Sequence, residues 1–198
     1  MSGQPQTGPA VPRVRVTNLA NMLTLLRLVL VPVFLLVLFA GNGHETVSRI
    51  AAFLVFAVAV ITDKVDGALA RNYGMVTEFG TLADPIADKT LIGAALIGLS
   101  MLGDLPWWVT VVILTREVGI TVLRFVMLRH GVIPASRGGK LKTLVQAVAI
   151  GLFILPLSGP WLMAATVVMA AAIVLTVVTG VDYVASAAKD ARGRPAAH

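Results

Sequence analysis

The sequence has no cysteine, only three histidines and few charged residues, and each shortage excludes a kind of chemistry. Without cysteine, the chain can form neither disulfides nor thiolate metal sites. His44, His130 and His198 stand far apart, and none has a neighbour at metal-ligand spacing. Any bound metal must therefore be a hard cation held by oxygen atoms. Charged residues make up 13% of the chain, against about 25% in a soluble globular domain.

The composition is that of an integral membrane protein, with 57% hydrophobic residues and a mean hydropathy of +0.88. Six apolar segments each approach the ~20 residues that a helix needs to cross a bilayer. They do not alternate as strands would, and only helices or closed barrels span lipid. We therefore expect an all-α protein with six transmembrane helices in one bundle, over residues 22–41, 47–66, 82–102, 105–129, 141–158 and 160–182.

The chain is expected to have three parts. Residues 1–15 are predicted to be a disordered cytoplasmic N-terminus, because this stretch begins polar and rich in proline and glycine. Residues 16–188 form the six-helix transmembrane domain, whose turns fall in clusters of glycine, proline and small polar residues. Residues 189–198 are a basic cytoplasmic tail.

The basic residues indicate how the bundle is oriented. One set of segment ends has only Arg49 nearby, and this set also carries Trp107, Trp108 and Trp161, as an aromatic belt would. By the positive-inside rule, the other ends are cytoplasmic, together with both termini. The net charge of +6 is thus explained by topology in an inner (cell) membrane, and we expect no nucleic-acid partner. The cytoplasmic set comprises Arg13, Arg15, Lys64, Arg71, Arg129, Arg137, Lys140, Lys142, Lys189, Arg192 and Arg194.

Four aspartates lie where water should be scarce. Asp63 and Asp66 stand at the end of the second apolar segment, and Asp84 and Asp88 at the start of the third. Their spacings place each pair on one helical face, and a short connection makes the two helices antiparallel neighbours. Carboxylates in membrane spans are costly and usually functional, so the reading as charges that merely end two helices is disfavoured. Two divalent ions about 4 Å apart would hold the four carboxylates together.

Residues 63–89, DKVDGALARNYGMVTEFGTLADPIADK, resemble the signature D-x2-D-G-x2-A-R-x8-G-x3-D-x3-D of the CDP-alcohol phosphotransferase family at every specified position. The resemblance implies a six-helix membrane fold, usually a homodimer, with a site facing the cytosol. It implies that the first three aspartates bind two Mg²⁺ or Mn²⁺ ions. Asp88 would share in metal binding and act as base on the incoming hydroxyl. The CDP moiety would lie over Gly67, Ala70, Arg71 and Gly80, with Asp66 also among its contacts. Taken singly, the small residues Gly67, Ala70 and Gly80 favour close helix packing.

Three features outside the signature bear on the acceptor. Asn21, Thr24 and Arg27 face one side of the first segment, where Arg27 either snorkels to the interface or contacts a ligand. Arg116 and Glu117 interrupt the fourth segment, and we favour function for Arg116 over a structural ion pair. Because adjacent residues do not face each other on a helix, at least one of the two needs another partner. Residues 136–143, SRGGKLKT, are predicted to form either a phosphate-binding turn at the start of a helix or a solvated basic loop.

These features resemble the branch of the family whose acceptor is glycerol 3-phosphate. The branch implies transfer of a phosphatidyl group from CDP-diacylglycerol to glycerol 3-phosphate, which gives phosphatidylglycerophosphate and CMP in phospholipid biosynthesis. Asn21 and Thr24 are then grouped with the CDP-binding residues. The candidates for the acceptor phosphate are the cations Arg27, Arg116, Arg137, Lys140 and Lys142.

Other functions stay open at this point. Within the family they are phosphatidylinositol-phosphate synthesis and cardiolipin synthesis of the CDP-alcohol type. A membrane prenyltransferase also uses aspartate-rich helices and Mg²⁺, but it would not release CMP. An ion transporter would place its carboxylates near the midplane, often within internal repeats, and no repeat is visible here.

Overall fold

The structure is a computed structural model that describes the backbone of residues 19–73, 78–128 and 137–192, with side chains for residue 22 and residues 25–63, 89–123 and 141–186. The described residues form helices and the turns between them, with no strand, so the all-α prediction is confirmed for this part of the chain. The helices are α1 Leu19–Phe39, α2 Thr46–Tyr73, α3 Glu78–Met101, α4 Trp107–Leu128, α5 Arg137–Ile154 and α6 Pro160–Arg192, with a 3₁₀ turn η1 at Ala40–Gly43.

The membrane character of the chain is carried most strongly by three of these helices. Leu25–Gly43, Thr46–Asp63 and Pro160–Ser186 are each long and apolar enough to cross a bilayer. Lys89–Met101 in α3 and Leu141–Ile154 in α5 are shorter apolar stretches. All six predicted segments are thus helical, whereas six membrane crossings remain a prediction.

Several helix boundaries differ from the predicted ones. α2 continues past residue 66 to Tyr73, so Asp63 and Asp66 do not end their helix. α3 begins at Glu78, so Asp84 and Asp88 lie inside it rather than at its start. α6 continues to Arg192 and takes in the first part of the predicted tail. Hydropathy places the end of a span at its first charges, but a helix can continue beyond the apolar stretch because its backbone hydrogen bonds are internal.

Glycines make the turns at one end of the bundle. Gly41 and Asn42 adopt the left-handed conformation, with φ of 59° and 57°, and the chain reverses there between α1 and α2. Gly103 and Gly159 take positive φ in the turns before α4 and α6. The turn clusters predicted near residues 41, 103 and 159 are therefore confirmed.

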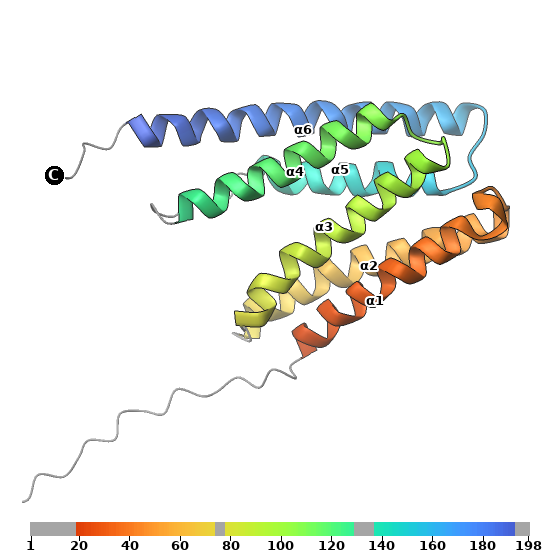
Figure 1. Ribbon diagram of the computed structural model, residues 1–198, viewed down its shortest axis with the longest axis horizontal. Helices are drawn as coiled ribbons and strands as arrows, with labels where there is room; N and C mark the ends of the chain where they lie inside the picture. Colours follow the sequence, from red (N-terminus) through yellow and green to blue (C-terminus); the bar gives the residue numbers. More distant parts are fainter. Residues whose placement is uncertain (1–18, 74–77, 129–136, 193–198) are drawn as a thin grey trace, which may run out of the picture.

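The helices form two groups joined by α3 and by direct packing of α2 on α5. In Figure 1, α1 and α2 lie together on one side, α4, α5 and α6 on the other, and α3 runs diagonally between them. Phe34 of α1 and Phe56 of α2 meet in the buried core, with ring centroids 5.8 Å apart. α3 packs closely on α1 at Gly98, where a β-carbon would lie 2.8 Å from a methyl group of Leu38. A larger residue at this crossing would have to displace the leucine side chain.

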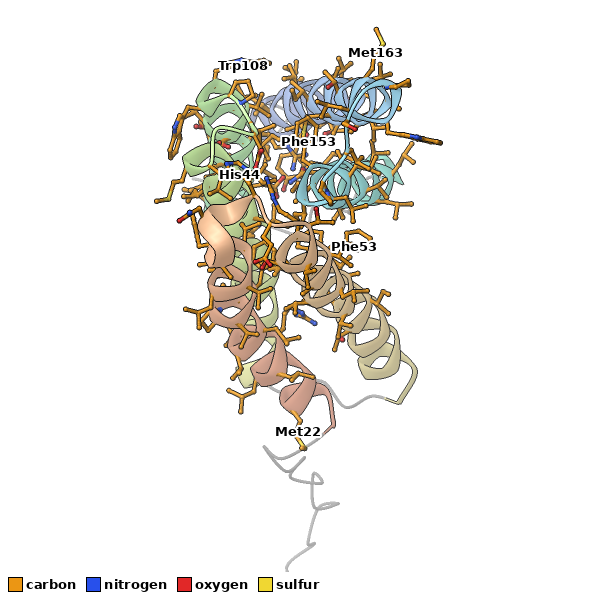
Figure 2. All side chains as sticks on the ribbon, turned by 90° about the vertical axis from the view of Figure 1, so that its right-hand side faces the viewer. Met22, His44, Phe53, Trp108, Phe153 and Met163 are labelled. Carbon is orange, nitrogen blue, oxygen red and sulfur yellow. The ribbon has the colours of Figure 1, made fainter. Side chains whose placement is uncertain are left out.

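The only basic residue expected near the outer end is neutralised inside the protein. Arg49 of α2 is 4% exposed and forms an ion pair with Asp104 in the connection between α3 and α4. Trp107 and Trp108 begin α4 and Trp161 begins α6, all with exposed side chains. Figure 2 looks onto this end, which carries the labelled His44 and Trp108. The three tryptophans thus share one end of the bundle, as the aromatic-belt interpretation requires.

Single-cysteine labelling can test the orientation, since the natural chain has no cysteine. Cysteines at positions 44 and 158, both exposed in turns at the tryptophan end, should react with an impermeant maleimide added outside intact cells. Cysteines at positions 3 and 75 should react only after the membrane is opened. Labelling of position 75 from outside would contradict the positive-inside argument. Position 43 is unsuitable, because a side chain there would collide with Leu102.

Candidate active site at the aspartate-bearing end of the bundle

The C-terminal end of α2 and the N-terminal end of α3 lie together. Both stand at the left of Figure 1, opposite the tryptophan end. Asp63, Asp66, Gly67, Ala70 and Arg71 belong to α2, and Gly80, Asp84 and Asp88 belong to α3. The fold therefore brings the two halves of the motif to one end of the bundle on antiparallel neighbouring helices. Of these residues only Asp63 has a described side chain, so the convergence of the carboxylates stays a prediction.

Asp63 is anchored by an arginine from the neighbouring helix. Arg27 Nη1 of α1 lies 3.0 Å from Asp63 Oδ1, and the arginine side chain is completely buried while that of Asp63 is 27% exposed. Arg27 therefore does not snorkel to the interface, which excludes one of its two interpretations. Burying a guanidinium is costly unless a carboxylate accompanies it. Arg27 thus joins α1 to the aspartate motif, whereas the side chains of Asn21 and Thr24 lie outside the described residues.

The aspartate motif offers oxygen donors for a metal at this end. Among the described side chains, no group of three or more His, Asp or Glu residues could hold a metal ion. The motif itself extends beyond those side chains and supplies three further carboxylates, which are the ligands that Mg²⁺ and Mn²⁺ prefer. Asp63 Oδ1 contacts Arg27, and a carboxylate has several lone-pair positions with which to bind a cation as well. The residues present therefore fit hard divalent ions.

A second charged cluster lies deeper in the bundle around Glu117 of α4. Its carboxylate accepts from Lys89 Nζ of α3 at 3.3 Å, from Arg116 Nη1 at 3.2 Å and from Lys142 Nζ of α5. The side chain of Lys142 is 3% exposed and that of Glu117 is 16% exposed. We call Lys89, Arg116, Glu117 and Lys142 the Glu117 cluster. Three helices thus bring three positive charges to one carboxylate, with Lys142 buried and the side chains of Arg116 and Lys89 18% and 32% exposed.

Arg116 contacts both the adjacent Glu117 and a residue of another helix. The expected second partner exists, because Arg116 Nη2 donates to Thr179 Oγ1 of α6 at 3.0 Å. Arg116 nevertheless also contacts the adjacent Glu117. Cβ positions of neighbouring helix residues diverge, but the long arginine stem lets the guanidinium fold back to the next side chain.

The predicted glycine-rich turn before α5 is largely helix. α5 begins at Arg137, so Gly138 and Gly139 lie in its first turn rather than in a loop. The first-turn N–H groups of a helix have no intrahelical partner, so this end keeps the donors that a phosphate site needs. Lys142 points into the bundle as part of the Glu117 cluster, which contradicts the solvated-loop interpretation for this residue. The side chains of Arg137 and Lys140 lie outside the described residues.

Two residues of this region were missed by sequence reasoning. Lys89 follows Asp88 directly and is a charge in an apolar stretch, so the rule applied to Arg116 should have selected it as well. Thr179 carries no such signal, because threonine is common in membrane helices and only its contact with Arg116 distinguishes it.

Comparison with known proteins identifies the family. The family model described as CDP-alcohol phosphatidyltransferase matches residues 17–178. The chain belongs to the CDP-alcohol phosphatidyltransferase family. It is 71% identical over 193 residues to a protein of Mycobacterium tuberculosis named probable phosphatidylglycerophosphate synthase, covering 98% of this chain and 92% of that protein.

More distant relatives carry a related name. A Bacillus subtilis protein named CDP-diacylglycerol–glycerol-3-phosphate 3-phosphatidyltransferase is 36% identical over 182 residues, which cover 84% of this chain and 93% of the relative. The Escherichia coli protein of the same name is 39% identical over 139 residues, which cover 67% and 74%. For this member of the CDP-alcohol phosphatidyltransferase family, both the aspartate motif and the Glu117 cluster lie inside the matched range.

Proposed function

We propose that this chain transfers a phosphatidyl group from CDP-diacylglycerol to glycerol 3-phosphate, forming phosphatidylglycerophosphate and CMP. The observation that carries the choice of acceptor is the Glu117 cluster, which gathers Lys89, Arg116 and Lys142 inside the bundle. Lys89 directly follows Asp88, the residue proposed as base, so the cluster adjoins the motif along α3. An acceptor could thus present its hydroxyl to Asp88 and its phosphate to the cluster.

The charge of the cluster favours a phosphate monoester. Its members carry three positive charges and one negative charge, which leaves two positive charges in a partly buried place. A phosphate monoester carries about −1.5 to −2 at neutral pH. The diester of phosphatidylglycerol carries a single negative charge, and inositol and serine carry no net charge. This comparison supports glycerol 3-phosphate or inositol 1-phosphate over the other acceptors, and the names of the relatives support the former.

The aspartates would bind the metal ions, and one of them would accept the proton of the acceptor hydroxyl. Asp63, Asp66, Asp84 and Asp88 would bind two Mg²⁺ or Mn²⁺ ions, which when bound neutralise the diphosphate of the donor and stabilise CMP as leaving group. Asp88 accepts the proton of the glycerol hydroxyl. The hydroxyl oxygen then bonds to the phosphorus that carries the lipid, and the bond from that phosphorus to CMP breaks.

The remaining candidate residues would position the substrates. Asn21, Thr24, Gly67, Ala70, Arg71 and Gly80 would contact the CDP moiety. Arg137 and Lys140 would join the Glu117 cluster in binding the acceptor phosphate, since they begin the helix that carries Lys142. Arg27, through its ion pair with Asp63, would link the acceptor phosphate site to the metal-binding aspartates. Positioning and charge neutralisation would supply most of the catalysis.

We propose the following setting for the enzyme. All six helices would cross the inner (cell) membrane, with residues 16–188 as the catalytic domain and both termini and the active site in the cytoplasm. The acyl chains of CDP-diacylglycerol would lie in the inner leaflet. The family resemblance supports a homodimer. Residues 1–15 would be a disordered N-terminus.

An acceptor panel tests the proposed function. Purified protein with CDP-diacylglycerol and Mg²⁺ is given glycerol 3-phosphate, inositol 1-phosphate, inositol, serine or phosphatidylglycerol, and CMP release is measured. We expect saturable release with glycerol 3-phosphate at a rate at least about tenfold above every other acceptor, a 1.4 kcal/mol preference. Faster release with inositol 1-phosphate would replace the proposed acceptor, and release with phosphatidylglycerol alone would favour cardiolipin synthesis.

A further inference from the structure

The guanidinium of Arg116 is held at both of its terminal nitrogen atoms. Nη1 donates to Glu117 Oε1 at 3.2 Å, and Nη2 donates to Thr179 Oγ1 at 3.0 Å. The first contact comes from the arginine's own helix, and the second comes from α6 on the other side of the cluster. A planar fork recognises phosphate well only when its orientation is set, and a free arginine side chain loses about 2 kcal/mol of rotamer freedom on being fixed.

Thr179 is itself locked in the orientation that accepts from arginine. Its hydroxyl donates to the backbone carbonyl of Leu175 at 2.6 Å, with the carbonyl of Thr176 of the same helix at 3.3 Å. A hydroxyl has one hydrogen, so once this is used the lone pairs remain to accept from Arg116 Nη2. The intrahelical bond thus turns Thr179 into a fixed acceptor rather than a rotating hydroxyl.

Gly180 provides the surface on which the arginine stem lies. A β-carbon at this position would stand 3.2 Å from Arg116 Cγ and 3.6 Å from Arg116 Nε. Glycine in a helix interior costs about 1 kcal/mol relative to alanine. At this position the missing side chain lets the stem of Arg116 lie close to the backbone of α6, and an added β-carbon would push the stem away by a few tenths of an ångström.

We propose that Thr179 and Gly180 of α6 are positioning residues that hold the Arg116 guanidinium in the acceptor phosphate site. This inference rests on the proposed function, which places Arg116 at the phosphate of glycerol 3-phosphate. Neither residue touches the substrate. Their effect passes through the angle and depth of the guanidinium, so disturbing them weakens acceptor binding and leaves donor binding intact.

The test compares substitutions that change one contact each. Thr179→Val keeps the shape of the side chain and removes the hydroxyl, and it should raise the KM for glycerol 3-phosphate about fivefold to tenfold. Thr179→Ser restores the hydroxyl and should return the KM to within about twofold of wild type. Gly180→Ala should raise the same KM about threefold, because the arginine stem must shift by a few tenths of an ångström. The KM for CDP-diacylglycerol should stay within about twofold throughout.

The chain offers a matched control for each change. Thr166 lies on the same helix, donates to Leu162 O at 2.9 Å and is exposed, so Thr166→Val removes the same intrahelical bond away from Arg116. Gly119 lies within α4, and a β-carbon there meets nothing within 4 Å among the described residues. Thr166→Val and Gly119→Ala should leave both KM values unchanged. Equal behaviour of Thr179→Val and Thr166→Val, or of Thr179→Ser and Thr179→Val, would overturn the proposal.

Failure of the inference can be told apart from failure of the proposed function. If wild-type protein releases no CMP with glycerol 3-phosphate, the proposed function is wrong, and the same variants are compared on the acceptor that does turn over. A selective rise in the KM for that acceptor would still support a positioning role for Thr179 and Gly180. Parallel rises in the KM values of donor and acceptor, with a lower unfolding temperature, would show that α6 packing and not arginine orientation was lost.

Discussion

Replacing Asp84 by asparagine should reduce CMP release at least about 100-fold, the loss that commonly follows removal of one electrostatic contact from an active site. The same is expected of Asp66→Asn and Asp88→Asn, since each removes a proposed metal ligand or the proposed base. EDTA should abolish turnover, and Mg²⁺ or Mn²⁺ should restore it. Steady-state CMP release with saturating donor and acceptor measures the effect.

Asp182→Asn is the matched control, because Asp182 is an exposed carboxylate on α6 outside the motif. It should retain full activity. Asp63→Asn should differ from the other three, because it also removes the charge that accompanies the buried Arg27. Breaking a buried ion pair from one side costs about 3–5 kcal/mol, and the partial exposure of Asp63 favours the lower end. This variant should therefore lose stability as well as activity. Full activity of Asp84→Asn, or turnover in EDTA, would contradict the two-metal proposal.

Removing a cation from the Glu117 cluster should weaken binding of the acceptor and leave binding of the donor largely unchanged. A cation paired with a phosphate contributes a hydrogen bond of about 1.5–3 kcal/mol, so Arg116→Ala and Lys142→Met should each raise the KM for glycerol 3-phosphate about tenfold or more. The KM for CDP-diacylglycerol should change much less. In Lys142→Met the carboxylate of Glu117 keeps its contacts with Lys89 and Arg116, so the buried charge is not left alone.

Two further variants sharpen the interpretation. Arg116→Lys keeps the charge but loses the planar fork, so a KM close to that of Arg116→Ala would show that geometry matters more than charge. Lys189→Ala removes a cation about three turns beyond Thr179 on α6 and should leave both KM values unchanged. An unchanged acceptor KM in both Arg116→Ala and Lys142→Met would place the phosphate site elsewhere. The choice of acceptor would then depend on the relatives' names alone.

Features that depend on neighbouring residues could be predicted from the sequence. Long apolar segments predicted six helices, and glycine clusters predicted the turns before α2, α4 and α6. The spacing of the aspartates identified the motif and, by resemblance, the family that comparison then confirmed. Segment length, turn propensity and residue spacing along a helix are local properties, so a single sequence contains them.

Helix ends were less predictable than helices. The charges at Asp63 and Asp66 suggested that α2 ends there, and the glycines at 138 and 139 suggested a loop before α5. In the structure both stretches are helical. Local composition indicates where an apolar span ends, whereas the end of the helix depends on what the following turns contact.

Which charges meet depends on how the helices pack, and this could not be predicted from the sequence. By hydropathy alone, Arg27 cannot be distinguished from any other arginine near a helix end. It is buried because Asp63 of another helix supplies a carboxylate partner. Apart from the adjacent Arg116 and Glu117, the partners in the Glu117 cluster and at Thr179 are 25 to 63 residues apart in the chain. A buried charge is stable only where the fold supplies its counter-charge, and that match is a property of the packed helices rather than of any one segment.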